Sequence, residues 1–453
     1  MSRRRKTEAH AETRRRGETE GGHSCPPNGG LENPPSGWEM SPIGDLTLRT
    51  KQRNPERDPE RRFFYVDVSS VSNTSFRIVA PTELPGAEAP SRARKVIQAG
   101  DVLFATVRPT LKRVALVPDD LHDQIASTGF IVLRSDALRL DSRYLYYRLL
   151  TDAFTQRMSE LERGASYPAV RDSDILNEKI ARPRIPEQRK IAGVLGLVQR
   201  AMEQQERLIA LTAELKKALL HQLFTQGLRG GPQKQTEIGP VPQSWEVVTI
   251  GDLFKFSSGK SRPDDTELTA SESRPFPVFG GNGILGYSGS FLLEESVLLL
   301  GRVGEYCGCA HHTDGCAWIS DNALYAKEIL GNIDTHYAAE YLAYANLNQY
   351  SNRAGQPLIT QGIISEVKMP LPPLDEQREI LEPLILLNRE LKHHEAKRNI
   401  IADLFRTLLH QLMTAQIRVH DLDLEGLLAQ VEREAGNSLL PKLRKPVAEM
   451  ECA

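Results

Sequence analysis

The sequence has few cysteines and no long apolar run. Its 453 residues include 5 cysteines, which is too few for a disulfide framework in a chain of this length, and the number is odd. No apolar stretch reaches the roughly 18–20 residues that cross a bilayer. The arginine-rich N-terminus also lacks the apolar core of a signal peptide. These absences predict a cytoplasmic protein.

An excess of charge of one sign is also missing. With 57 Lys and Arg against 59 Asp and Glu, the net charge is −2, which indicates neither nucleic-acid nor membrane binding by the chain as a whole. The charge is uneven, however. Residues 36–186 carry 23 cations and 20 anions, whereas residues 242–374 carry 8 and 15. Any surface for a polyanion in the second segment must therefore be local.

One cluster contains possible metal ligands: Cys307, Cys309, His311, His312 and Cys316. Tetrahedral zinc sites usually use Cys-x₂₋₄-Cys spacing with a second pair further away. Cys-x-Cys in a strand points both thiols to one face without giving that spacing. Buried or incidental cysteines are the favoured interpretation and a zinc site is the alternative, so we predict no metal ligands.

What the chain does contain is a long internal repeat. Each copy opens with Pro-x-x-Trp-Glu, at Pro35 and again 207 residues later at Pro242. Each copy closes with Glu-Gln-Arg, at Glu187 and again at Glu376, and the Leu-Leu-His-Gln-Leu of 219–223 recurs unchanged at 408–412. The openings and closings match, whereas the middles differ in sequence and length.

The closing segments, 187–229 and 375–420, are predicted to be long helices. Their apolar residues fall mostly at spacings of three, four and seven, the seven-residue repeat with which helix packs on helix. Two such helices in a duplicated chain are expected to pair as an antiparallel coiled coil. The seam residues are Ile191, Leu195, Val198, Met202, Ile209, Leu215, Leu219 and Leu223 in the first helix, and Ile380, Leu384, Leu387, Leu391, Ile401, Leu404, Leu408 and Leu412 in the second.

Polar residues interrupt both seams near the middle, Gln205 in one and His394 in the other, and such interruptions can fix register. Prolines are expected to precede each helix and none to lie inside. The first helix would be about 60 Å long at about 1.5 Å per residue. The alternative is a pair of ordinary amphipathic helices, each packed on its own domain. The prolines concerned are Pro183 and Pro186, then Pro370, Pro372 and Pro373.

The segments before the helices, 35–186 and 242–374, have a different sequence pattern. Short β-rich runs at 102–107, 131–133 and 296–300 are separated by Gly, Asn and Pro. Helical stretches follow at 143–161 and 335–350. The prediction is an α+β fold with two α+β domains in tandem, each followed by a long helix. Residues 1–34 are predicted to be a disordered tail, 230–241 a linker and 421–453 a C-terminal tail.

This order of elements resembles the specificity subunit of type I restriction–modification enzymes. The likeness covers about 35–420, with two target-recognition domains and two helical conserved regions. Pro-x-x-Trp-Glu and Pro…Glu-Gln-Arg-x-Ile are similar to the motifs that begin the domains and the helices in this family. Gly100–Phe104 with Arg108-Pro109 and Ser127–Phe130 resembles one common recognition-domain type. Gly280–Tyr287 with Gly301-Arg302 and Ser320–Asn322 resembles another.

The resemblance implies a non-catalytic subunit that binds double-stranded DNA. Each domain would read one half of a bipartite, asymmetric site, and the paired helices would set the gap between the halves. The helices would dock two methyltransferase subunits, which restriction/translocase subunits would join. The resemblance also implies that this chain binds no cofactor itself, and that S-adenosylmethionine, ATP and Mg²⁺ are held by partner subunits.

Within such domains, phosphate contacts give affinity and contacts to base edges give specificity. The candidates lie beside predicted strands or in Ser/Gly-rich loops, and their alternative interpretation is solvated surface. In the first domain they are Arg108, Lys112 and Arg113. In the second domain, Lys260 and Arg262 are candidate phosphate contacts, and Asn282, Tyr287 and Arg302 are candidate groove readers.

Signatures of catalysis are weak. Asn33-Pro34-Pro35-Ser36 resembles the Asn-Pro-Pro-aromatic motif of amino-methyltransferases, but Ser36 cannot stack on a flipped base. No Gly-x-x-x-x-Gly-Lys-Ser/Thr loop for ATP and no Gly-rich turn suited to S-adenosylmethionine is found. Two rival hypotheses stay open: an enzyme with unfamiliar motifs, and a coiled-coil adaptor that binds only proteins.

Overall fold

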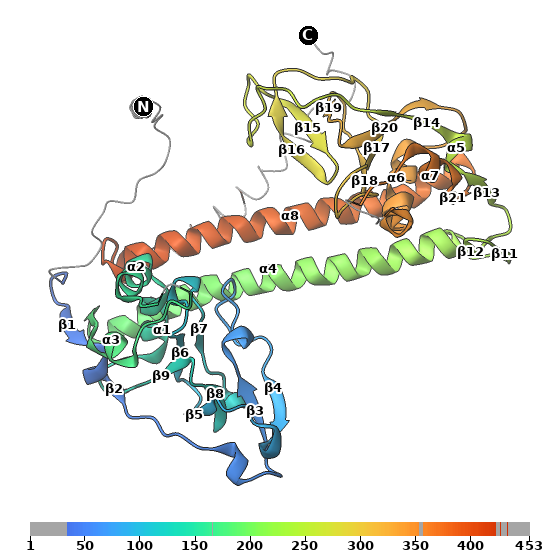
Figure 1. Ribbon diagram of the computed structural model, residues 1–453. Helices are drawn as coiled ribbons and strands as arrows, with labels where there is room; N and C mark the ends of the chain where they lie inside the picture. The colour runs from blue at the N-terminus through green and yellow to red at the C-terminus, as the bar shows by residue number, and fades with distance from the viewer. Residues whose placement is uncertain (1–33, 165, 353–356, 423–425, 427–432, 434–453) are drawn as a thin grey trace, which may run out of the picture. The chain divides into compact units, whose positions relative to one another are not determined.

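The computed structural model describes residues 34–164, 166–352, 357–422, 426 and 433. The predicted N-terminal tail, apart from residue 34, and nearly all of the C-terminal tail lie outside these described residues. The chain divides into two compact units, one formed by residues up to Leu195 together with Thr407–Leu422, and the other by Gly196–Arg406 and the residues beyond 422. Each unit holds one α+β domain with parts of the two long helices (Figure 1).

In the first unit, two four-stranded sheets form the domain (Figure 1). The strands of the first sheet are antiparallel in the order β2 (Thr47–Leu48), β9 (Phe130–Ser135), β6 (Val102–Ala105) and β7 (Val114–Leu116). The second has the order β4 (Thr82–Pro85), β3 (Arg62–Val66), β8 (Gln124–Ser127) and β5 (Ala93–Ile97), with β3 parallel to β8. All four residues of β6 are buried, which explains its unbroken apolar sequence.

Helices and a short two-stranded pair complete this domain. Asp141 caps α1 (Ser142–Leu150) and Thr151 caps α2 (Asp152–Leu161), so the helical stretch expected at 143–161 is two helices. After α3 (Asp172–Asn177), β10 (Lys179–Arg182) pairs with β1 (Glu39–Pro42), and the start of the domain is thereby fastened to its end. The 3₁₀ turns are η1 (Ile43–Leu46), η2 (Pro55–Arg57), η3 (Val68–Ser70), η4 (Gly86–Glu88), η5 (Pro109–Leu111) and η6 (Asp119–Leu121).

The domain of the second unit repeats this plan. Its larger sheet has the order β14 (Phe254–Ser258), β20 (Ala323–Ile329), β17 (Leu298–Gly301) and β18 (Ala310–His312). Its smaller sheet has the order β16 (Gly283–Ser288), β15 (Phe276–Gly280) and β19 (Trp318–Ile319), with β15 parallel to β19. Among the described strands of this sheet, none is a counterpart of β5.

The remaining elements of the second domain follow the same order. A hairpin of β11 (Gln233–Thr236) and β12 (Gly239–Pro242) precedes it. Its opening strand β13 (Glu246–Thr249) pairs with its closing strand β21 (Lys368–Leu371), as β1 does with β10. The helices between them are α5 (Ile250–Leu253), α6 (Thr335–Tyr344), η7 (Leu347–Tyr350) and α7 (Gln361–Glu366), and a last turn, η8 (Val419–Asp421), follows in the first unit.

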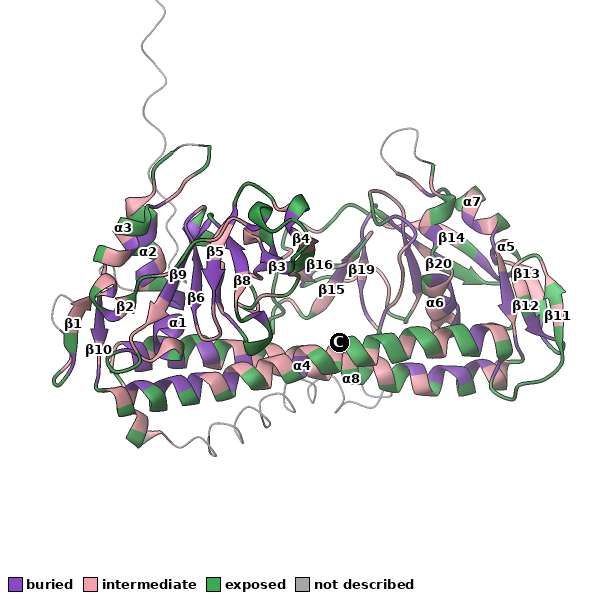
Figure 2. Cartoon of the chain, turned by 90° about the horizontal axis from the view of Figure 1, so that it is seen from below, coloured by how far each residue is buried: buried purple, intermediate pink, exposed green. Residues whose placement is uncertain are grey.

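The two long helices are α4 (Ile185–Gln226, 42 residues) and α8 (Leu374–Met413, 40 residues). Within the second unit they pack antiparallel, because Leu223 at the end of α4 shares a core with Ile380 and Leu384 at the start of α8. Along both helices, buried and half-buried residues alternate with exposed ones, so each helix has a covered side and an exposed side (Figure 2). Gly227, with φ +67°, ends α4, two residues before the predicted boundary at 229.

Three details of the helices differ from the sequence prediction. Leu215 is 56% exposed and does not lie in the seam, where the half-buried Thr212 and Lys216 occupy the facing positions. Pro383 lies inside α8 and removes a hydrogen bond to the carbonyl of residue 379, so the expectation of a helix without an internal proline is wrong. The helix ends at Met413, short of residue 420. The other residues of the predicted seam are buried or half-buried.

The repeated Glu-Gln-Arg has a structural role that its central glutamine explains. The Gln188 side chain is fully buried, accepts a hydrogen bond from the Asp141 N–H (2.8 Å) and donates to the carbonyls of Arg139 and Pro183. Gln377 makes the same three bonds in the second unit. Each glutamine therefore fixes the start of its long helix to the residue that caps the preceding domain helix.

None of the described helices is both long enough and apolar enough to cross a membrane.

Candidate DNA interface

Both domains end their central strand in the same backbone framework. In the first, the Thr106 N–H donates to the Gly129 carbonyl (2.9 Å), and the Val170 N–H donates to the Thr106 carbonyl (2.9 Å). In the second, Arg302 stands in the place of Thr106: its N–H donates to the Asn322 carbonyl, and its carbonyl accepts from the Ile359 N–H, both at 2.9 Å. We call these places the β6 loop end (Thr106–Arg108, Ser127–Gly129, 163–164 and 166–170) and the β17 loop end (Arg302–Gly304, Ser320–Asn322, Asn352 and 357–359).

A later segment of chain is attached in the same way in both domains. The Arg108 N–H donates to the Pro168 carbonyl (2.7 Å), and the Gly304 N–H donates to the Pro357 carbonyl (2.9 Å). A backbone pair joins Arg163 to Ala169 in the first domain, and another joins Asn352 to Leu358 in the second. Each domain thus holds a later segment of chain beside its central strand by the same backbone hydrogen bonds, with different side chains.

Glycines bring the strand ends of the second domain close together. A Cβ at Gly301 would lie 2.0 Å from the Gly281 carbonyl oxygen, and one at Gly259 would lie 2.2 Å from the Ile319 carbonyl oxygen. Only glycine permits these approaches of β14, β15, β17 and β19. The glycine-rich motifs of the sequence therefore serve packing at the β17 loop end.

The structure separates the three cations expected in the first domain. Arg108 is exposed, has a left-handed backbone (φ 49°), and its guanidinium lies 5.8 Å from the ring centre of Tyr167. Lys112 is half-buried in an ion pair with Asp152. Arg113 donates to the carbonyls of Val68 and Val71. Two of the three are thus engaged with the protein, and Arg108 faces solvent.

In the second domain, the expected residues fall into two groups. Lys260 follows β14 with its backbone paired to Ile319 and Ser320, and Asn282 lies in the turn between β15 and β16. Arg302 is half-buried, with Nη1 3.3 Å from the Ser258 hydroxyl. The structure brings these three to the β17 loop end.

Arg262 and Tyr287 lie beside it, around the turn that contains Asp265. Arg262 is exposed, and Tyr287, in β16, pairs through its backbone with Glu267. The Asp265 carboxylate accepts hydrogen bonds from the Gly289 N–H and the Ser288 hydroxyl, and these bonds lower its pKa. The carboxylate therefore orders the loop that carries Arg262.

Sequence reasoning missed Tyr167 and Thr106. Tyr167 is 75% exposed, and its position against Arg108 is apparent only when the chain is folded. Large exposed aromatic side chains stack well on nucleotides, which could have marked it as a candidate. Thr106, a buried residue between apolar neighbours, carries no comparable signal.

The Cys/His cluster lies at β18 and its neighbouring loops and adjoins the β17 loop end, because the Cys307 N–H donates to the Gly304 carbonyl at 3.0 Å. Cys307 is fully buried, and the His312 Nε2 is 3.0 Å from the Thr335 hydroxyl. Burial, with a smaller contribution from the neighbouring His336, lowers the pKa of His312 to about 4. No group of three or more His, Cys, Asp or Glu side chains in the described part of the chain has an arrangement that could hold a metal ion.

Comparison with known proteins decides the family. The model of the type I restriction modification DNA specificity domain matches twice, over residues 35–213 and 242–401, which is most of the chain. This protein belongs to the type I restriction–modification DNA specificity family. The two matches coincide with the two copies of the internal repeat, each a domain with the first part of its long helix.

Relatives and solved structures agree with this membership. The type I restriction enzyme MjaVIII specificity subunit of Methanocaldococcus jannaschii is 22% identical over 352 residues, 66% of this chain and 76% of the relative. A structure described as the basis of complex assembly and conformational transition of the type I R-M system is 27% identical, with a TM-score of 0.51, covering 84% of this chain and 98% of that one. The S subunit from M. genitalium, at 18% identity and a TM-score of 0.60, covers 83% and 96% and shows the same fold.

Family membership settles what kind of protein this is. It is a DNA specificity subunit, and its role is recognition of DNA sequence, not catalysis. Such subunits assemble with methyltransferase and restriction subunits and bind DNA. The loop ends of the two domains are therefore candidate surfaces for DNA, and the long helices are candidate surfaces for protein.

Proposed function

We propose that this specificity subunit reads a bipartite, asymmetric DNA site, with one half-site bound at the β6 loop end and the other at the β17 loop end. One observation supports this above all: the two loop ends share their backbone hydrogen bonds and differ in their side chains. The same scaffold then docks on DNA in the same way twice, while different side chains meet different bases. A target with two unlike halves follows.

The proposed contacts in the first domain centre on Arg108. Its exposed guanidinium lies against Tyr167, so a phosphate or base edge can reach the cation and the ring together. Because Lys112 and Arg113 have protein partners, we propose that they support this surface and contact DNA less directly.

In the second domain, the proposed contacts divide by chemistry. Lys260 and Arg262 are exposed beside the loop ordered by Asp265, and they suit phosphates. Asn282 and Arg302 can pair with base edges, as amide and guanidinium groups do in grooves, and Tyr287, further along β16, is a third candidate groove reader. This domain has a net charge of −7 over residues 242–374, from 8 cations and 15 anions, so its grip on DNA depends on these few cations.

We propose that the long helices hold the methyltransferase subunits. In the second unit, α4 exposes an apolar stripe on its outer surface, formed by Leu208, Leu211 and Leu215, which are 40%, 51% and 56% exposed. Spacings of three and four place them on one helix surface. Leu197 of α4 and Leu386 of α8, 189 residues apart in the repeat, are exposed in the same way. Such equivalent positions favour two docked subunits.

The remaining parts of the proposed assembly are partners of this chain. Restriction/translocase subunits would join the docked methyltransferase subunits, and S-adenosylmethionine, ATP and Mg²⁺ would be bound by those partners. Because the substrate is DNA in the cell, we propose a cytoplasmic location.

The direct test is to co-express the chain with its cognate methyltransferase subunit and to map methylated bases across the host genome. The proposal expects one split motif with unlike halves. A continuous palindrome, or methylation without any motif, would contradict it. As a control, a chain with residues 242–374 exchanged for those of another specificity subunit should change only one half of the motif.

A further inference from the structure

A cleft of about 510 Å³ lies in the first domain, where the segment from Lys51 to Arg61 passes over the ends of β3, β5 and β8. Three buried apolar side chains form its floor: Phe63, Val96 and Ile125. Its rim is polar. An apolar floor under a polar rim is a usual design for a site that binds a ligand in a fixed orientation.

The rim carries more cations than anions. Lys51, Arg53, Arg57 and Arg61 face two acidic residues, Asp58 and Asp123, so four positive charges meet two negative ones. Lys51 and Arg57 are exposed, and within the described residues neither side chain makes an ion pair. The cleft therefore favours an anion.

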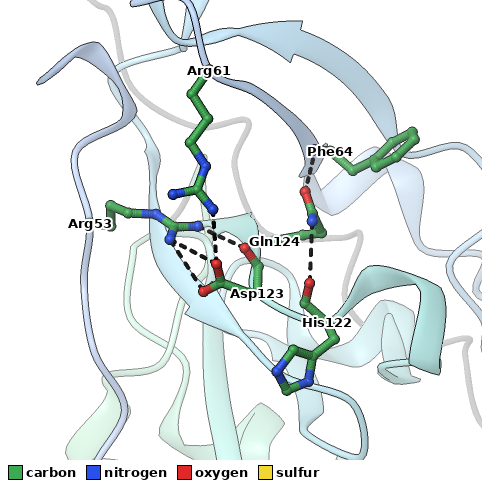
Figure 3. A network of polar contacts seen from close by, with 6 residues as sticks. All are labelled: Arg53, Arg61, Phe64, His122, Asp123 and Gln124. Carbon is green, nitrogen blue, oxygen red and sulfur yellow. Dashed lines mark hydrogen bonds and ion pairs between the residues drawn. The ribbon is translucent and has the colours of Figure 1, made fainter. Parts of the chain in front are cut away.

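Two of the cations are held in place by one carboxylate (Figure 3). Arg53 Nη1 lies 3.0 and 3.2 Å from the two carboxylate oxygens of Asp123, and its Nη2 donates to the Asp123 carbonyl at 2.7 Å. Arg61 Nη2 donates to the same carboxylate at 3.1 Å, and the other two guanidinium nitrogens of Arg61 make no hydrogen bond to the described residues. One carboxylate thus orders two guanidiniums and neutralises one of them.

The carboxylate is itself fixed. Asp123 has φ 58°, a left-handed conformation that Asp adopts more readily than most residues. Partial burial would raise the pKa of this carboxyl, but the hydrogen bonds and charges of Arg53 and Arg61 lower it overall, so it is ionised at neutral pH. Arginines ordered in advance lose little freedom when they bind, which favours recognition of a phosphate.

The cleft adjoins the β6 loop end through a series of contacts. Gln52 pairs with Lys95 of β5, and the Lys95 ammonium lies 2.8 Å from the Asp172 carboxylate at the start of α3. Asp172 comes two residues after Val170, which is bonded to Thr106 at the loop end. These contacts connect the cleft to the β6 loop end within one domain.

We infer that the cleft binds a backbone phosphate of DNA beside the first half-site, with Arg53 and Arg61 donating to the phosphate oxygens, Asp123 positioning both, and the exposed Arg57 adding a third cation that contacts the phosphate. This inference rests on the proposed function. The second domain offers no such carboxylate in the same place: when the parallel pair β15–β19 is matched to β3–β8, Cys316 takes the position of Asp123. The backbone grip is then stronger on one half-site.

The test compares Arg61→Ala and Arg57→Ala with a matched control, Arg62→Ala. Arg62 is the neighbour of Arg61 in the sequence, is exposed, and pairs with Glu83 across the sheet, outside the cleft lining. Arg57 has no ion-pair partner among the described residues, so its loss cannot unfold the cluster. The full chain with its methyltransferase subunit is titrated with duplex DNA carrying the mapped motif, and with scrambled DNA, at several salt concentrations.

Each cleft variant should lower the slope of log affinity against log salt by about 0.9 per lost phosphate contact, for both DNAs, and leave the ratio of the two affinities unchanged. Arg62→Ala should keep the wild-type slope. Equal slopes for all three variants would overturn the inference, and so would a change confined to the motif DNA.

A free phosphate could fill the same site, and a thermal-shift titration with inorganic phosphate separates the two sources. Stabilisation that Arg61→Ala abolishes, with an unchanged DNA slope, would reassign the cleft to a free anion and overturn the inference. If the wild-type complex methylates no split motif, the proposed function fails. If it does, and the slopes do not differ, the cleft assignment alone fails.

Discussion

Gln377 makes three hydrogen bonds from a fully buried amide, and we expect its replacement by methionine to destabilise the second unit strongly. Its oxygen accepts from the Asp334 N–H (2.8 Å), and its nitrogen donates to the carbonyls of Asn332 (3.2 Å) and Pro372 (2.9 Å). Methionine has a similar volume and no amide. Three groups would then lose their partner.

The magnitude follows from the net value of a buried hydrogen bond, about 1 kcal/mol, which gives about 3 kcal/mol for the three bonds. For a unit of this size, each 1 kcal/mol moves the melting temperature by about 2–4 °C, so we expect a fall of about 6–12 °C. The effect should be local as well. Asp334 is the N-cap of α6, and its amide should exchange with solvent much faster in Gln377→Met.

Urea denaturation and amide hydrogen exchange measure both expectations. Gln222→Met is the matched control, because Gln222 is exposed on α4 and its loss should change the free energy of unfolding by less than about 0.5 kcal/mol. If the two variants lose the same stability, or if the Asp334 amide keeps its protection from exchange, the Gln377 hydrogen bonds do not hold the helix to the domain and the reasoning is wrong.

Three further predictions concern the seam, the arginine cluster and the helix surface. Gln205→Leu should lower the free energy of unfolding by about 1–2 kcal/mol, because the His394 Nδ1, 3.0 Å from the Gln205 oxygen, loses its partner. Adding His394→Leu should recover most of this loss. A double-mutant cycle that shows no coupling between the two residues would contradict the prediction. The pKa of Asp123 is lowered in the fold, so its ionised form stabilises the fold at pH values above the unfolded carboxyl pKa, near 3.8. This stabilisation is lost as the pH falls through the lower pKa of the folded state. The melting temperatures of wild type and Asp123→Asn should therefore converge in acid, and a constant difference between them would count against the ion pairs. Leu211→Glu should change the free energy of unfolding by less than about 0.5 kcal/mol and weaken binding of the methyltransferase subunit at least about tenfold, as measured by calorimetry. Binding equal to that of the wild type would show that the stripe is not a docking surface.

The sequence predicted the large elements because their signals are periodic. Ile191 and Leu195 recur at helical spacing with Val198, and all three are buried. The buried run at Val102–Ala105 is a strand in the middle of a sheet, where an unbroken apolar sequence is expected. The repeat itself predicted two domains with one plan, which the matching sheet orders confirm.

The errors came where a second influence competes with spacing. Leu215 is four residues before Leu219, but the seven-residue repeat continues through Thr212 and Lys216, so Leu215 lies one position off the repeat and is exposed. Pro383 is tolerated within α8 because a helix with its other face packed against a domain core can lose one hydrogen bond.

The candidate site was less predictable than the fold. Arg108, Lys112 and Arg113 are alike as sequence, but folding gives Lys112 a carboxylate, gives Arg113 two carbonyls and leaves Arg108 exposed. Those partners are 40 or more positions away in the chain. The cluster of Arg53, Arg61 and Asp123 was missed for the same reason, since 70 positions separate Arg53 from its carboxylate.

The two copies of the repeat also use one shared residue differently. Glu376 accepts a hydrogen bond from the Trp245 indole N–H (3.0 Å) in the second unit. Its equivalent Glu187 instead pairs with Arg418 (2.8 Å), whose guanidinium lies over the Trp38 ring in the first unit. Arg418 follows α8, so a residue from the end of the described chain completes the start of the first helix. The repeat therefore places the same glutamate at the start of each long helix, and residues outside the repeated motif decide how the tryptophan and the glutamate interact in each copy.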